Sequence, residues 1–271
     1  MKTMLCIVPG LLCFFWVPAQ TLYAGSNFPL GTSAYSTGFS NPFSFLCNTA
    51  SLADCETGAA LSASNRYMLK ELAEYTAAAT LPVAAGGIGL AMHYTGTAAA
   101  YSNMQWALAY GKALGRVQIG AGVTYNHTRI PGYVSNGAIS YAIGTIWQLT
   151  PKFRSGLQLA NFVGAKSNPS NTQPLSWSVG AGYEWSEKLL LWGVIAKEST
   201  MPAQVRVNMQ YVVERSFVAG IGVMLDVASP WFSLGWQWEN FRALITAAFH
   251  PQLGLTPGLM INVQAERDKH K

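Results

Sequence analysis

Apolar residues recur at every second position in short stretches that run from about Gly58 to Ala265. In the stretch 203–213, for example, valine, methionine and tyrosine alternate with glutamine, arginine and asparagine. A period of two is the pattern of β-strands whose two faces meet different environments. Only 11% of the residues are charged, whereas the water-exposed face of a soluble sandwich carries charge. The pattern therefore predicts an all-β chain that forms a single transmembrane antiparallel β-barrel, apolar outside and polar within.

The alternation is interrupted often enough to define about 14 strands. Connections near 84–86, 112–115, 150–152, 186–188, 214–215 and 239–240 are short, and those between them are mostly longer. Short turns at one end and longer loops at the other are typical of outer-membrane barrels, and an even strand number places both ends of the barrel on the periplasmic side. The predicted strands start near Gly58, Tyr75, Gly87, Ser102, Arg116, Asn136, Phe153, Leu175, Leu189, Ala203, Ser216, Trp231, Phe241 and Gly258.

The two predicted faces differ in side-chain size. The apolar face carries large aromatic residues, which in membrane barrels form girdles at the lipid interfaces. The opposite face is rich in glycine, which weakens a strand unless another group approaches closely, so the lumen is predicted to be filled. The aromatic residues assigned to the outer face are Trp106, Tyr110, Tyr125, Tyr141, Trp147, Trp177, Tyr183, Trp185, Trp192, Trp236 and Trp238.

The first residues are typical of a secretory signal peptide. Lys2 is followed by an apolar run, and small residues surround a cleavage position after Ala19. The predicted organisation is a signal peptide over 1–19, an N-terminal hatch over 20–55, an outer-membrane β-barrel over 56–265 and a charged periplasmic tail over 266–271. The predicted location is the outer membrane of a Gram-negative cell, in contact with its lipid.

The hatch segment does not alternate and is rich in Gly, Ser, Asn, Phe and Pro. Near its end stands the run Asn48, Thr49, Ala50, Ser51, Leu52 and Ala53. This run resembles the Asn-Pro-Ala-Gly-Leu-Ala motif that precedes the first strand of FadL-like outer-membrane barrels, with Thr49 and Ser51 replacing the proline and the glycine.

Two further runs resemble the PorV/PorQ-like branch of these barrels in Bacteroidota, which includes components of type IX secretion. They are Asn65–Leu72 and His250–Pro257. The resemblance implies a barrel of 14 strands with a plugging N-terminus. The chain departs from many outer-membrane barrels at its end, where the charged run 266–271 stands in place of a terminal aromatic residue.

Cys47 and Cys55 are the two cysteines that remain after removal of the predicted signal. An oxidising compartment permits a disulfide between them, and two reduced thiols in a packed hatch are the alternative. Their spacing does not suggest a metal site.

Both signs of charge occur at positions predicted to face the lumen. Either they hold the hatch to the wall or they line a polar path for a substrate, and the mixture of signs favours the first role. The residues are Arg66, Glu74, Arg154, Glu184, Arg206, Glu239 and Arg242.

The sequence contains no arrangement that predicts catalysis, a metal or a cofactor, and no basic stripe that predicts nucleic-acid binding. His93 is predicted to face the lumen. The first functional hypothesis is a non-enzymatic accessory or scaffold subunit that docks against other outer-membrane or periplasmic proteins. The alternative is a FadL-like passive transporter of hydrophobic small molecules, with Phe39, Phe43, Phe45 and Leu46 lining a pocket beside the hatch.

Overall fold

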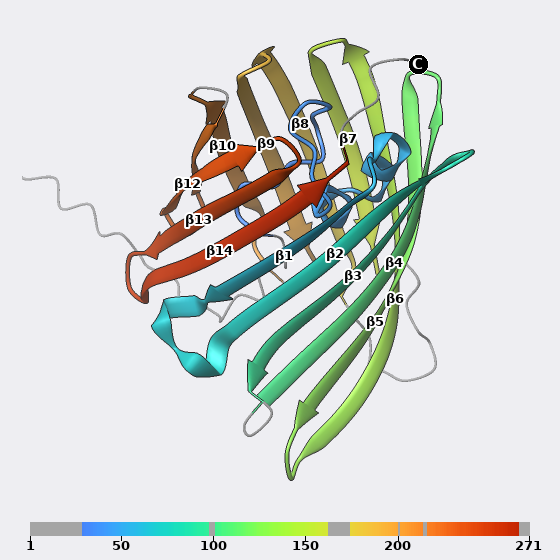
Figure 1. Cartoon of the computed structure of the whole chain (residues 1–271). Helices are drawn as coiled ribbons and strands as arrows, with labels where there is room; N and C mark the ends of the chain where they lie inside the picture. Colours follow the sequence, from blue (N-terminus) through green and yellow to red (C-terminus); the bar gives the residue numbers. More distant parts are fainter. Residues whose placement is uncertain (1–28, 98–100, 162–173, 200, 214–215, 266–271) are drawn as a thin grey trace, which may run out of the picture.

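The computed structural model describes residues 29–97, 101–161, 174–199, 201–213 and 216–265. Fourteen antiparallel strands form one closed barrel, in which each strand pairs with its neighbours in sequence and β1 pairs with β14 (Figure 1). The strands are β1 Gly58–Asn65, β2 Ala73–Val83, β3 Gly86–Thr97, β4 Tyr101–Leu114, β5 Val117–Ile130, β6 Val134–Thr150, β7 Phe153–Ala160, β8 Ser176–Ser186, β9 Leu189–Glu198, β10 Gln204–Val212, β11 Phe217–Met224, β12 Ser229–Trp238, β13 Phe241–His250 and β14 Gly254–Gln264.

The observed strands confirm the predicted fold class and strand number, and their starts differ little from the predicted ones. The largest difference is at β14, which begins at Gly254 instead of Gly258. The predicted loop before this strand ran from Pro251 to Pro257. Pro257 pairs with β13, and the β1 ladder begins only at Gly258, so β14 has one neighbour at this level and tolerates a proline there.

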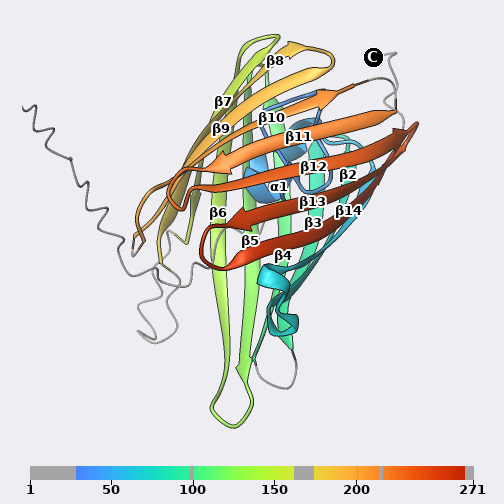
Figure 2. The ribbon, with the colours of Figure 1, turned by 90° about the vertical axis from the view of Figure 1, so that its left-hand side faces the viewer.

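The two ends of the barrel differ. At the turn end, where β1 begins and β14 ends, the links between β2 and β3, β4 and β5, β6 and β7, β8 and β9, and β12 and β13 are two residues long. At the opposite loop end, two short 3-10 helices, η2 (Arg66–Met68) and η3 (Lys70–Leu72), connect β1 to β2. The long strands β5 and β6 project far beyond the rest of the wall at this end (Figure 2).

The outward face of the barrel is apolar. Ten of the 11 aromatic residues assigned to this face are between 38% and 70% exposed, as a lipid-facing surface requires. Trp192 is the exception, because it points inward and is only 5% exposed. Trp192 packs inside the barrel with Phe39, Leu190 and Trp231. The next residue on β9, Gly193, therefore faces outward.

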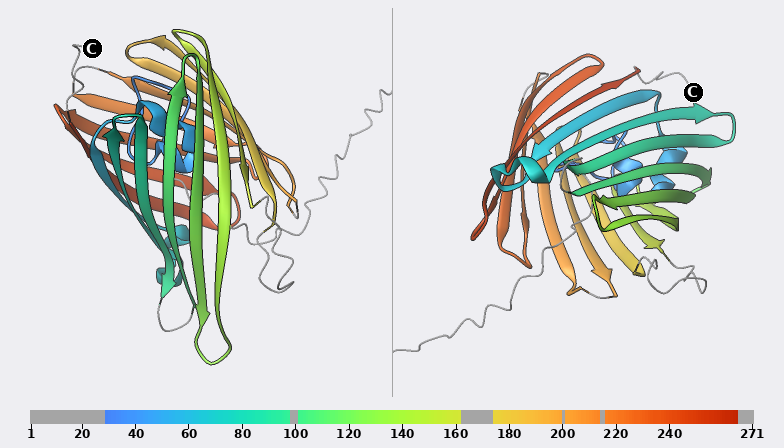
Figure 3. Two further views of the ribbon diagram at one scale, coloured as in Figure 1. Left: turned by 90° about the vertical axis from the view of Figure 1, so that its right-hand side faces the viewer. Right: turned by 90° about the horizontal axis from the view of Figure 1, so that it is seen from below.

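The core lies inside the barrel, between the wall and residues 29–57, which we call the plug segment. It includes the helix α1 (Ser44–Cys47) and the 3-10 helix η1 (Thr49–Asp54) and fills the lumen toward the turn end (Figures 1 and 3). Phe43, Phe45 and Leu52 pack there against small and aliphatic wall residues. The predicted signal, the predicted tail and residues 20–28 of the predicted hatch lie outside the described residues, and the domain limits stay predictions.

None of the helices within the described residues is long and apolar enough to cross a membrane.

The apolar outer face predicts that an introduced charge is costly at mid-strand and tolerated at a strand end. Leu234 lies near the middle of β12 and Leu114 is the last residue of β4, and both side chains are more than half exposed. We expect Leu234→Arg to lower the free energy of unfolding by about 2–4 kcal/mol and Leu114→Arg by about 0–1 kcal/mol. Urea unfolding in phospholipid vesicles, followed by tryptophan fluorescence, measures both. Equal, small losses would show that hydrocarbon does not contact this face.

Candidate functional site

The plug segment fits the wall because glycines leave room for it. A Cβ on Gly180 would lie 2.1 Å from the Tyr35 ring, and one on Gly144 would lie 2.2 Å from Asn48 Oδ1. No side chain larger than hydrogen fits at these positions without displacing the plug segment. Many of the glycines that the alternation assigned to a filled lumen are thus places where the plug segment approaches the wall. Burial raises the pKa of Tyr35 to about 12.

The carboxylate of Glu184, at the turn end of β8, holds the first part of the plug segment. Its Oε1 accepts hydrogen bonds from Ser36 Oγ at 2.7 Å, Thr37 N at 2.6 Å and Gly38 N at 3.2 Å. Charge-assisted bonds of this kind are roughly twice as strong as neutral ones. Glu184 therefore attaches the plug segment to β8.

The predicted hatch motif forms the second attachment. The Asn48 side chain caps η1 by accepting a hydrogen bond from Ala50 N. Its Nδ2 donates to the carbonyl oxygens of Thr145 at 3.2 Å and Leu157 at 3.3 Å. Thr49 N donates to Gln158 Oε1 at 2.8 Å. The motif thus caps a short helix and bonds to β6 and β7 in the same few residues, because an asparagine amide carries both donors and an acceptor.

An ion pair forms the third attachment. Asp54 Oδ2, at the end of η1, lies 2.7 Å from Arg154 Nη2 on β7 and also accepts from Gln118 Nε2 on β5. The Arg154 side chain is only 6% exposed, so the loss of Asp54 would leave a buried cation without its partner. Asp54 is a residue that the sequence interpretation missed, because nothing in its local pattern indicates a contact with β7.

The other predicted lumenal charges do not form one network. Arg66 pairs with Glu74 at 2.8 Å at the loop end, while Arg206 donates to Gln204 and Arg242 donates to Gln237. The prediction that Glu239 faces the lumen is wrong. Glu239 lies in the exposed turn between β12 and β13, with φ 44°. The charges therefore form separate clusters at different heights.

Cys47 and Cys55 are both free thiols in the structure. Desolvation by burial raises the pKa of Cys47 to about 12 and that of Cys55 to about 11. Cys47 Sγ contacts the Thr32 carbonyl at 3.9 Å and packs beside Tyr35, whereas Cys55 lies against the position of Gly87. Within the described residues no group of three His, Cys, Asp or Glu side chains could hold a metal ion.

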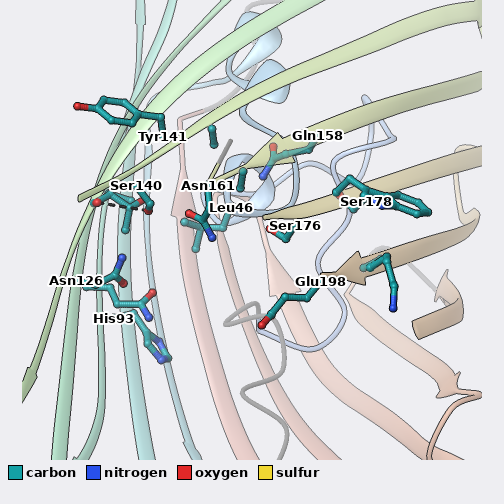
Figure 4. Close-up of a pocket in the computed structure, with 18 of the residues that line it drawn as sticks. Leu46, His93, Asn126, Ser140, Tyr141, Gln158, Asn161, Ser176, Ser178 and Glu198 are labelled. Atoms are coloured by element: carbon teal, nitrogen blue, oxygen red, sulfur yellow. Dashed lines mark hydrogen bonds between the residues drawn. The ribbon is translucent and has the colours of Figure 1, made fainter. Parts of the chain in front are cut away.

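A cavity of about 290 Å³ lies on the loop-end side of the plug segment, inside the lumen (Figure 4). Leu46 of the plug segment lies at its inner end, and Asn161, Ser176 and Met201 line it toward the loop end. Its walls come from β2 to β10. The lining is mostly alanine, serine, threonine and side-chain amides, and the charged residues in it are Lys197 and Glu198, of opposite sign.

The cavity contains some of the predicted residues and not others. Of the four residues predicted to line an apolar pocket, Leu46 lines this cavity, whereas Phe39, Phe43 and Phe45 are at most 3% exposed and form packed core. They fill the space left by small wall residues, and so the proposed pocket is solid at their positions. His93 faces the lumen as predicted, with Nδ1 2.8 Å from Thr76 Oγ1 and Nε2 2.7 Å from Thr95 Oγ1.

Comparison with known proteins gives likeness in fold alone. No protein-family model matches the chain, and no curated protein matches its sequence. The solved structures that resemble it include the Pseudomonas putida toluene transporter TodX, with TM-score 0.57 and 9% identity over 88% of this chain and 98% of that one. They also include the CymD monoaromatic hydrocarbon channel, with TM-score 0.54 and 12% identity over 81% and 91%. The Acinetobacter baumannii outer-membrane protein Omp33 gives a TM-score of 0.53 and 8% identity over 78% of this chain and 98% of that one.

Closed topology, apolar exterior and these neighbours together define the class. The chain is an outer-membrane β-barrel, located in the outer membrane and surrounded by its lipid.

The anchoring role of Glu184 predicts a change in the reactivity of Cys47. Burial raises the pKa of Cys47 to about 12, so little of the thiol is ionised at pH 8, and the thiolate is the reactive form. Glu184→Leu leaves the donors of Ser36 and Thr37 unpaired, so we expect maleimide labelling of Cys47 to become roughly tenfold faster. Glu184→Gln keeps one acceptor oxygen, and its labelling rate should lie between those of the parent and Glu184→Leu. The measurement uses the mature chain with Cys55→Ser.

Glu187→Leu, in the adjacent exposed turn, is the matched control and should label as slowly as the parent. If Glu184→Leu and Glu187→Leu label at the same rate, Glu184 does not anchor the plug segment.

Proposed function

We propose that the protein is a passive transporter of small, uncharged, mainly hydrophobic molecules across the outer membrane. The observation that carries this proposal is the cavity of about 290 Å³ inside the lumen, which reaches the loop end and stops at the plug segment. A cavity of this size is just below the range of drug-sized ligands and suits a molecule of about one ring. The neighbours described as a toluene transporter and a monoaromatic hydrocarbon channel support the same function.

Passage beyond the cavity requires the plug segment to move. The space between Leu46 and the turn end is filled by the buried side chains of Phe43, Phe45 and Leu52. A molecule in the cavity therefore meets packed side chains. The attachments through Glu184, Asn48 and Asp54 are all non-covalent. We therefore propose that the plug segment is the gate and that these attachments set the frequency of its opening.

The scaffold hypothesis is a second proposal, and one observation favours it. The two runs that resemble the PorV/PorQ branch meet at the loop end, where the rings of Tyr67 and His250 lie 5.7 Å apart and Tyr67 N donates to Thr256 Oγ1 at 3.1 Å. This contact leaves Met68 63% and Leu69 49% exposed on η2 and beside it. A partner protein could bind these two side chains. Membership of that branch and a role in type IX secretion stay predictions.

Uptake tests the transport proposal. Ala142 lines the cavity, and its neighbour Ile143 faces the lipid and is 45% exposed. In a Gram-negative host without its own porins, we expect the protein to raise the initial rate of uptake of radiolabelled toluene. Ala142→Trp fills the cavity and should return the rate to that of the empty vector, whereas Ile143→Trp should keep it.

Uptake that never exceeds the empty vector, with the folded barrel verified in the membrane by its heat-dependent gel shift, would contradict the transport proposal. Uptake that survives Ala142→Trp would contradict passage through this cavity.

Co-purification tests the scaffold proposal. We expect the barrel with Met68→Ser and Leu69→Ser to lose proteins that co-purify with the parent in mild detergent, because the exposed apolar surface is removed. Leu81→Ser, on the lipid face of β2, is the control. Recovery of the parent barrel alone under several mild detergents would count against docking.

A further inference from the structure

One wall of the cavity carries a buried amide without a partner. Asn126 on β5 is 5% exposed and lines the cavity, where it lies near His93 (Figure 4). Among the described residues no group forms a hydrogen bond with its side chain, although the neighbouring His93 uses both ring nitrogens. A buried amide is costly unless something in the cavity bonds to it, either water or a ligand.

Polar groups on other strands also face the cavity without partners. Gln158 on β7 uses its Oε1 to accept from Thr49 N, which leaves its Nε2 free within the described residues. The hydroxyl of Ser178 on β8 lines the same cavity and likewise has no partner there. Donors and acceptors therefore face the cavity from more than one side.

Between these polar groups the cavity wall has small apolar patches. Leu46, Ala91, Ala107 and Ala142 line the cavity and offer nothing but van der Waals contact. The lining charges are Lys197 and Glu198, which have opposite sign, and Lys197 already donates to the carbonyl of Met201. An ion would thus find no uncompensated charge, and burying one without a partner is expensive.

We infer that this cavity is a binding site for a neutral, one-ring-sized amphiphile that carries a single hydroxyl or carbonyl group. The polar group bonds to the amide of Asn126, and the apolar part contacts Leu46 and the alanines. This inference rests on the proposed function, because it names the class of molecule that the transporter takes. It also separates this chain from its hydrocarbon-channel neighbours, since a bare hydrocarbon would displace water and leave Asn126 unpaired.

A matched series of one-ring probes tests the inference: benzyl alcohol, toluene and benzoate. The mature barrel is placed in lipid nanodiscs, and equilibrium dialysis of each radiolabelled probe is corrected with empty nanodiscs. One ordinary hydrogen bond predicts that benzyl alcohol binds roughly 2- to 12-fold more tightly than toluene. Benzoate should bind most weakly, because its charge has no partner.

Asn126→Leu keeps the side-chain size and removes the amide, so we expect it to abolish the preference for benzyl alcohol over toluene. Asn126→Ala provides a second variant if Asn126→Leu does not fold, and it should abolish the preference as well. Asn103→Leu on β4 is the matched control, because Asn103 already donates to Thr128 Oγ1 and does not line the cavity. It should keep the preference of the parent.

The outcomes separate this inference from the proposed function. Saturable binding of benzyl alcohol that depends on Asn126, together with no uptake in cells, would keep the site and reject transport. Toluene uptake blocked by Ala142→Trp, together with equal binding of toluene and benzyl alcohol, would keep transport and reject the inference. Equal binding of all three probes, or a preference unchanged in both Asn126→Leu and Asn126→Ala, overturns the inference.

Discussion

The hydrogen bonding of the backbone in a medium without water is the constraint on which this structure depends. Inside a bilayer each unpaired N–H or C=O group costs several kcal/mol, so a sheet must close on itself. Here the closing contact is the ladder from Gly58–Gln264 to Ser64–Gly258 between β1 and β14. It joins the ends of a chain segment of about 200 residues, and the strands between need only pair with their neighbours in sequence.

Closing the sheet into a barrel creates an interior space, which side chains or water must fill. The inner wall is built of glycine, alanine and short polar residues, and these leave too much space for the wall to pack against itself. The plug segment supplies the missing volume at the turn end. Beside β2–β10 the plug segment meets a polar cavity at Leu46, whereas Leu30 and Phe39 still pack against Trp231 and Ala248 of β12 and β13. The packed part of the lumen therefore extends further on one side of the barrel than on the other.

Much of this fold could be predicted from the period-two alternation, because register along a strand forces every second side chain to the same face. Strand number and most strand starts follow from it, and the inward glycines correctly indicate a close approach. Two of the failures share one cause. Trp192 and Phe43 were assigned by their chemistry to lipid and to a pocket, whereas both pack between plug and wall. A barrel with a filled lumen has two apolar environments, and alternation alone does not distinguish them.

The candidate site was harder to predict for the same reason. Asp54 and Arg154 are 100 residues apart in sequence, and neither has a local pattern that indicates the other. Asn126 is equally inconspicuous, because an inward asparagine in a polar lumen is ordinary. What distinguishes it is an amide that lines the cavity and has no hydrogen-bond partner among the described residues, which only the packed structure can show. Sequence patterns therefore predict the wall, and the chemistry of the lumen emerges from contacts between distant strands.

The attachments of the plug segment are unevenly distributed around the wall. Toward β1–β4 and β11–β14 the contacts are mainly apolar, and toward β7 and β8 they include the bonds of Glu184, Arg154 and Gln158 beside the packed ring of Tyr35. Water can replace hydrogen bonds at a small net cost, whereas exposing apolar surface has no such compensation. Displacement on the β7–β8 side breaks these bonds and also exposes the ring of Tyr35, which is buried against Gly180 and Gly182. Gln158 connects this side to the cavity, because its Oε1 holds Thr49 while its side chain lines the cavity. A ligand that bonds to this amide acts directly on one of the contacts that close the lumen.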